Sequence, residues 1–209
     1  MMSQAPPDPK ARHRGIGYSL LYPAGWREFN TSVEHEQALT KLVTAEPKAL
    51  GRVDLVLMLR QKMHQMFEYL RRRGSLGFAM PVEKLSSGAM PVSVIMTPLK
   101  VGTTGSLLDA ARRAAGGSQI EIEDADGAEW YLWTSSEQSD EAPELKNKGL
   151  NLVVPRPKPD GSLDPDPKAG LWLLFSYSYV DSDNGEEFAE GLRTLGYAIL
   201  GTFKWVPIQ

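Results

Sequence analysis

The chain has 209 residues, of which 42% are hydrophobic, and its formal net charge is −3, from 23 basic and 26 acidic side chains. This balance of charge gives no electrostatic reason to expect nucleic acid or an acidic membrane surface as a partner. The chain contains no cysteine, which excludes disulfides, thiolate metal ligands and cysteine nucleophiles and favours the reducing cytoplasm as its location.

The N-terminal segment, residues 1–14, is polar and rich in proline. It lacks the apolar run of about seven to fifteen residues that a secretory signal needs, and no stretch of the chain approaches the roughly 20 apolar residues of a membrane span. We expect residues 1–14 to form a disordered arm. Residues 15–209 are expected to form a single α+β domain, because a domain of this size can bury a sizeable core.

In the first half of the chain, short strands are expected on both sides of a long polar helical region. Thr31 or Ser32 can cap the start of this region, and Pro47 is expected to divide it into two helices. The second helix, about Ala49–Arg73, carries apolar residues spaced by three and four positions, which form one stripe. The strands predicted in this half are 18–22, 26–29, 76–83 and 91–101.

In the second half, Ser106–Ala115 is predicted as a short helix and Asp183–Lys204 as a closing helix. The apolar face of the closing helix is expected to carry Phe188, Leu192, Leu195, Ile199 and Phe203. The strands predicted in this half are 119–123, 129–134, 150–155 and 171–180. Because the strands do not alternate regularly with helices, we predict an antiparallel sheet of about six or seven strands with helices packed on it. The two long helices are expected to bury their stripes on a shared face of this sheet.

Large aromatic residues recur on the predicted strands. A period of two places Trp130 and Trp133 on opposite faces of one strand, and it places Trp172 opposite to Tyr177 and Tyr179 on another. If helices cover only one face of the sheet, aromatic side chains lie open on the other face and form an interface. In the alternative, helices or long loops cover both faces.

Arg71, Arg72 and Arg73 form a compact basic cluster at the end of the second helix. Guanidinium groups in such a cluster can bind phosphate or the acidic surface of a partner. The alternative is that they interact only with the negative C-terminal end of their own helix.

The sequence shows no recognisable catalytic or metal-binding motif. None of the three histidines, His13, His35 and His64, has a second histidine four residues later, as a helical zinc site requires. The segment 74–77 is one residue short of a nucleophile elbow, and the acidic loop 181–186 lacks the spacing of a calcium loop. We therefore predict no enzyme activity, no cofactor and no metal.

Two segments resemble PsbP-like domains. The segment Tyr18–Trp26, YSLLYPAGW, is similar to their opening strand and turn, and Leu171–Trp205 is similar to their last strand and closing helix. Mog-like proteins and actinobacterial LpqN-like proteins are relatives of this kind. The resemblance implies a sheet with helices on it and a family that acts mostly by binding other proteins, and it carries over no catalytic residues.

We accordingly predict a non-catalytic protein-interaction module, accessory or chaperone-like, that binds a protein partner and neither nucleic acid nor membrane. Self-association as a homodimer is a related hypothesis. The predicted partner-binding residues are Trp130, Trp133, Trp172, Tyr177, Tyr179, Arg71, Arg72 and Arg73. The alternative is a small apolar ligand held between the sheet and the helix that carries Met58, Met63 and Met66, since methionines adapt to varied apolar ligands. A hydrolase assembled from residues distant in sequence is the less favoured reading.

Overall fold

The computed structural model describes residues 15–83, 90–102, 104–125, 127–138 and 144–208. The predicted disordered arm, residues 1–14, lies outside the described residues. Within those described residues, none of the helices has the length and apolar character needed to cross a membrane.

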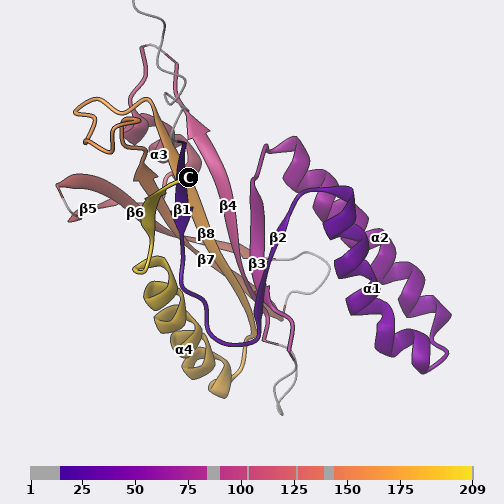
Figure 1. The fold of residues 1–209 in the computed structure, drawn as a ribbon. Coiled ribbons are helices and arrows are strands. Elements are labelled where there is room, and N and C mark those ends of the chain that lie inside the picture. The colour runs from indigo at the N-terminus through magenta and orange to yellow at the C-terminus, as the bar shows by residue number, and fades with distance from the viewer. Residues whose placement is uncertain (1–14, 84–89, 103, 126, 139–143, 209) are drawn as a thin grey trace, which may run out of the picture.

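A seven-stranded antiparallel sheet, counted over the described residues, forms the centre of the molecule (Figure 1). In spatial order its strands are β2 (Trp26–Asn30), β3 (Gly77–Pro81), β4 (Val92–Lys100), β8 (Ala169–Val180), β7 (Leu145–Pro155), β6 (Ala128–Gln138) and β5 (Glu121–Ala125). The predicted strand 171–180 corresponds to β8, which lies in the middle of the sheet between β4 and β7. The α+β class, the antiparallel sheet and its predicted size are confirmed.

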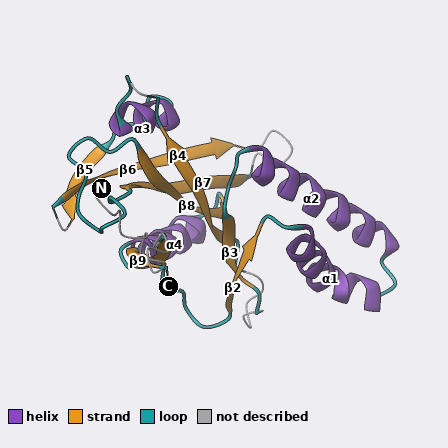
Figure 2. Cartoon of the chain, turned by 45° about the horizontal axis from the view of Figure 1, so that its top comes forward, coloured by secondary structure: helices purple, strands orange, loops and turns teal. Residues whose placement is uncertain are grey.

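Helices cover both faces of this sheet (Figure 2). One face carries α4 (Asp183–Leu200), and the opposite face carries α3 (Leu107–Ala115) and the helical hairpin of α1 (Val33–Ala49) and α2 (Val53–Arg72). The expectation that the two long helices share one face is therefore wrong. The stripe of α2 contributes Phe67 and Leu70 to a cluster over β2 and β3, whereas α4 packs over β7 and β8.

Side chains alternate along β8 between these two layers, as the period of a strand requires. Leu173, Phe175 and Tyr177 lie in the core cluster that α4 covers. Trp172 packs from the other face against the cluster that contains α3. The predicted separation of Trp172 from the tyrosines is confirmed.

A separate two-stranded sheet joins the two ends of the described chain. It pairs β1 (Ile16–Ser19) with β9 (Lys204–Pro207) in antiparallel register. The sequence predicted a strand at Tyr18–Tyr22 and a helix as far as Lys204. The helix instead ends at Leu200, because the residues that follow pair with the opposite end of the chain, and no local pattern indicates such a pairing.

Two further expectations about the helices are corrected. Pro47 does not divide the helical region, because it lies within α1, and the chain turns at Gly51, whose φ of 68° is left-handed. Phe188 is 48% exposed, whereas Ala189 is buried. The buried face of α4 is therefore turned by one residue from the predicted stripe at this end.

Candidate functional site

The predicted aromatic interface is divided between the core and the surface. Trp133, Tyr177 and Tyr179 are 3–4% exposed and belong to core clusters. A partner could contact the two tyrosines only if the core opened, whereas Trp133 also lines a pocket between β5, β6, β7 and α4. The alternative, in which helices cover both faces of the sheet, is the arrangement found. Trp130 and Trp172 are only partly buried and keep some accessible surface.

The basic cluster is divided as well. Arg71 pairs with Glu36 and with Glu68, and its Nε donates to the carbonyl oxygen of Thr31. Arg73 instead places its guanidinium 5.1 Å from the ring centre of Trp172, a cation–π contact. Two of the predicted partner-binding residues, Arg73 and Trp172, therefore contact each other. The charge of Arg71 is instead paired with carboxylates of the same chain. Arg72 is exposed.

The Glu36 carboxylate connects the two helices of the hairpin. It pairs with Arg71 and lies 2.9 Å from Nδ1 of His64. Burial raises the pKa of Glu36, but the hydrogen bonds and charges of His64 and Arg71 outweigh burial and hold the pKa below its usual value. We therefore expect the stability of the hairpin to depend on the charge of the Glu36 carboxylate.

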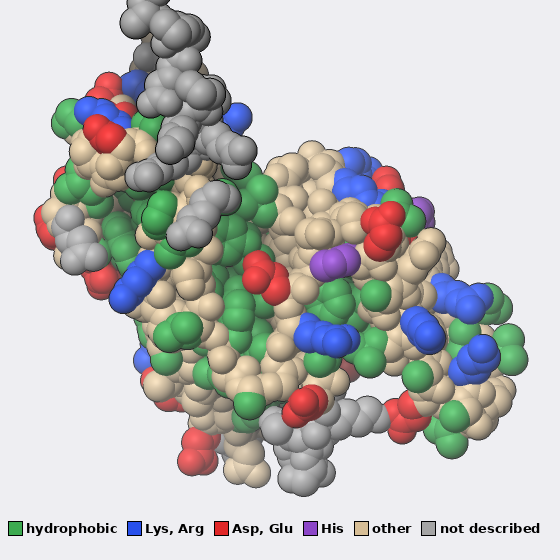
Figure 3. All heavy atoms as spheres, in the orientation of Figure 1, with side chains coloured by type: hydrophobic (Ala, Val, Ile, Leu, Met, Phe, Trp, Pro, Cys, Tyr) green, Lys and Arg blue, Asp and Glu red, His purple; other side chains and the backbone are tan. Residues whose placement is uncertain are grey.

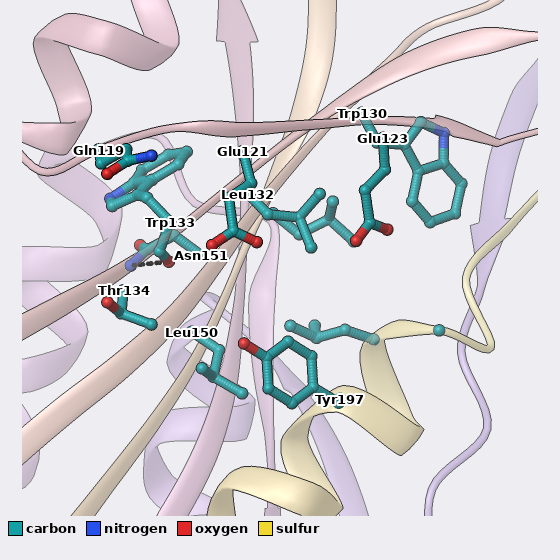
Figure 4. Close-up of a pocket in the computed structure, with 13 residues that line it drawn as sticks. Gln119, Glu121, Glu123, Trp130, Leu132, Trp133, Thr134, Leu150, Asn151 and Tyr197 are labelled. Atoms are coloured by element: carbon teal, nitrogen blue, oxygen red, sulfur yellow. Dashed lines mark hydrogen bonds between the residues drawn. The ribbon is translucent and has the colours of Figure 1, made fainter.

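A pocket of about 350 Å³ lies between β5, β6, β7 and the C-terminal end of α4 (Figure 4). We call it the β5 pocket, and its lining consists of Gln119, Glu121, Glu123, Trp130, Leu132, Trp133, Thr134, Leu150, Asn151, Leu152, Tyr197, Leu200 and Gly201. Its volume lies at the small end of the range of about 300–1,000 Å³ that is usual for ligand pockets.

The strand register explains why two carboxylates enter this pocket. Glu121 pairs with Leu132 and Glu123 pairs with Trp130 across the antiparallel β5–β6 hairpin. Directly paired residues share a face, so both glutamates lie on the side of the sheet that α4 covers. Figure 4 shows both carboxylates turned toward the space above Tyr197. Ile122, on the opposite face, is 50% exposed.

The chemistry of the β5 pocket is acidic at the rim and apolar at the base. Neither the Glu121 nor the Glu123 carboxylate makes an ion pair or a hydrogen bond with the described residues. The lining contains no lysine, arginine or histidine. Its base is formed by leucines, and the Trp130 ring is held edge-on against Phe203 at 6.0 Å. The pocket therefore combines two uncompensated negative charges with an aromatic wall.

A second and larger hollow, about 770 Å³, lies beyond Trp130. It is bounded by the turn before β6, the proline-rich segment 155–167 and β9. Trp205 closes one side, and its Nε1 donates to the carbonyl oxygen of Pro155 at 2.8 Å. Trp130 therefore lines both hollows, and its role as a partner-binding residue stays a prediction.

Beside the methionine helix, the hollow between the end of α2 and the sheet is small. Met63 and Met66 pack into the core cluster of the hairpin, and Met58 is 47% exposed. The hollow at the end of α2, beside Arg73 and Trp172, measures only about 40 Å³. That volume is far below the range of small-molecule sites.

The hairpin offers a different exposed surface. Lys and Arg side chains gather on it, interspersed with hydrophobic side chains (Figure 3). Leu50, Val53 and Leu57, at the end far from the sheet, are 60–70% exposed. This surface differs in charge from the acidic β5 pocket.

His35 and His64 make separate contacts, and His13 lies outside the described residues. His35 Nδ1 accepts a hydrogen bond from the backbone N–H of Asn30 at 2.9 Å, and His64 pairs with Glu36. No group of three His, Cys, Asp or Glu side chains within the described part of the chain is arranged to hold a metal ion.

Sequence reasoning missed Glu121, Glu123 and Tyr197. The alternation at 119–123 indicates that the two glutamates share a face. The β5–β6 register and the position at which α4 ends determine which face of the sheet α4 covers at β5. Both are set by contacts between distant segments.

Comparison with known proteins gives distant likenesses only. No family model matches the chain, and no curated protein matches it. The solution structure of cyanobacterial PsbP (CyanoP) from Synechocystis sp. PCC 6803 is 13% identical, with a TM-score of 0.46, and the match covers 91% of this chain and 87% of that one. A mutant of the protein Mog1 is 12% identical, with a TM-score of 0.35, over 61% of this chain and 78% of the other. Likenesses this distant carry no function to this chain, and the LpqN-like branch stays a prediction.

Proposed function

We propose that this protein is a non-catalytic protein-interaction module, and that it recognises its partner at the outer edge of β5 and the adjoining β5 pocket. The observation that carries the proposal is the position of β5 at the end of the large sheet. Within the described residues β5 pairs with β6 and with no other strand. Its outward backbone groups are a template for an extended segment of another chain.

A binding mode of this kind uses two features that β5 has side by side. Backbone hydrogen bonds to an edge strand supply affinity, and pockets for alternate side chains supply specificity. The β5 pocket lies on one face of the strand. On the other face Ile122 is half exposed and offers an apolar contact.

The charge of the edge favours a different protein over a second copy of this chain. Glu121, Glu123 and Asp124 are exposed along β5. If two copies paired through this edge, like charges would lie opposite one another, which is destabilising. The same carboxylates repel the phosphates of nucleic acid. The absence of cysteine fits a partner in the cytoplasm.

Photo-crosslinking in the cells that produce the protein tests this proposal. A photoreactive amino acid replaces Ile122, and in the control it replaces Val180, which is 55% exposed at the end of β8. A discrete partner crosslinked several-fold more from position 122 than from position 180 supports the proposal. Equal crosslinking from both positions, or none from 122, contradicts it.

A further inference from the structure

The two carboxylates of the β5 pocket are held near each other without a compensating charge. The side chains of Glu121 and Glu123 project from one face of β5, two residues apart, and neither carboxylate has a hydrogen-bond or ion-pair partner among the described residues. Like charges at this spacing repel each other. A bound cation would relieve that repulsion. Because part of the pocket wall is apolar, the attraction between the cation and the two carboxylates is stronger there than in open water.

The rest of the pocket suits a cation that is carried on a hydrocarbon stem. Trp130 presents an aromatic ring beside Glu123 (Figure 4), and an indole face attracts ammonium and guanidinium groups. Leu132 and Leu200 line the base and offer apolar surface to methylene groups. A small inorganic cation would gain nothing from these leucines. A lysine or arginine side chain would place its charge beside the carboxylates and its methylene groups against the leucines.

The geometry of strand addition brings such a side chain to the pocket. In an antiparallel pair, directly opposite residues have Cβ atoms about 4.5–5.5 Å apart and share a face. A segment that added to β5 would place two of its side chains, two positions apart, opposite Glu121 and Glu123. Basic residues at alternate positions of the segment would therefore meet both carboxylates in register.

We propose that the β5 pocket binds lysine or arginine side chains of an extended partner segment, in which basic residues alternate with uncharged ones. This inference rests on the proposed function and names the class of segment that the same site recognises. Charge complementarity and the unpaired edge of β5 together favour such a segment over a free organic cation, which would use the pocket and leave the edge unpaired.

Fluorescence anisotropy of a labelled peptide, Thr-Lys-Thr-Lys-Thr-Lys-Thr, measures the interaction on the full chain. The matched peptide carries glutamine in place of each lysine. We expect the lysine peptide to bind about tenfold more tightly or better, because a tenfold ratio corresponds to about 1.4 kcal/mol, the size of a few partly enclosed charge contacts. Equal binding of the two peptides would overturn the inference.

The matched protein variants separate the pocket from the total charge. The double variant E121Q/E123Q should lose the preference for the lysine peptide. The double variant E137Q/E187Q removes the same charge from two exposed glutamates that lie outside the pocket lining, and it should keep the preference. The first variant should also keep the wild-type melting temperature, because it removes no ion pair. Spermidine that displaced the lysine peptide at equal or lower concentration would show that the ligand is a free amine, and it would sink the inference.

A crosslinking experiment in cells distinguishes the failure of this inference from the failure of the proposed function. The photoreactive residue at position 122 is combined with E121Q/E123Q. Loss of the partner crosslink supports the cationic segment. A partner crosslink of undiminished yield rejects the cationic segment and leaves the interaction at β5 standing, whereas no crosslink from position 122 in the otherwise unchanged protein rejects both.

Discussion

Two glycines of α4 differ in how closely they approach the sheet. A Cβ added at Gly196 would lie 2.6 Å from Cδ1 of Phe175 and 2.7 Å from Cδ1 of Leu150, whereas one added at Gly191 meets nothing within 4 Å. We expect Gly196→Ala to lower the free energy of unfolding by about 1–3 kcal/mol through overpacking. Gly191→Ala should raise it by about 0.5–1 kcal/mol, because alanine favours the helix. Urea denaturation of both variants checks the pair, and a Gly196→Ala variant as stable as wild type would show that α4 does not sit this close to β8.

Asn151 is a buried polar residue that the sequence did not single out. Its Oδ1 accepts a hydrogen bond from Nε1 of Trp172 at 3.0 Å, and its Nδ2 donates to Oγ of Ser135 at 3.1 Å. Asn151→Ala leaves the indole N–H without this partner, so we expect a loss of about 1–3 kcal/mol in the free energy of unfolding. The control is Asn147→Ala, since Asn147 is less buried and, among the described residues, its side chain hydrogen-bonds only to the Ser178 hydroxyl. Equal losses in the two variants would contradict a special role for Asn151.

At the scale of elements, the α1–α2 hairpin should lose stability in acid. The pKa of Glu36 is held below its usual value, so the folded state favours the charged form. Such a group contributes stability that is present above its usual pKa of 4.5 and is lost as the pH falls through the lower folded value. Glu36→Gln should therefore reduce the free energy of unfolding at about pH 7, and the difference from wild type should shrink toward about pH 3.

The matched control for that titration is Glu137→Gln. Glu137 is exposed on β6, and its side chain makes no ion pair or hydrogen bond with the described residues. Its substitution should change stability little at either pH. A deficit of Glu36→Gln that stayed constant from neutral to acid pH would show that the carboxylate charge is not what joins α1 to α2.

The elements that the sequence predicted well are those with a strong local pattern. The alternation of β8 and the stripe that ends at Phe67 and Leu70 both correspond to observed elements. The strand segments that the sequence did not predict depend on pairing with distant parts of the chain. β9 forms because it pairs with β1. β7 extends through Lys146 and Lys148 because it lies between β6 and β8. Polar residues in such a strand give no hydrophobic period to read.

At the scale of the whole molecule, the candidate site depends on how three segments meet. The Glu-Ile-Glu alternation in β5 is visible in the sequence, yet the pocket exists only because Tyr197 and Leu200 at the end of α4 lie beneath it. Trp130 was predicted as a contact residue on the basis of aromatic alternation alone, and the structure gives it a specific place between two hollows. The acidic edge of β5 and the hairpin end around Leu50, Val53 and Leu57 are two distinct exposed surfaces.

Hydrogen–deuterium exchange of the full chain, with and without the lysine peptide, tests most directly whether a partner segment pairs with β5. Strand addition gives the outward backbone N–H groups of Glu121–Ala125 new hydrogen bonds, so we predict slower exchange in β5 when the peptide binds. Exchange in α1 and α2 should stay unchanged. Protection of the hairpin or of the opposite edge strand β2, with none at β5, would contradict the proposed site.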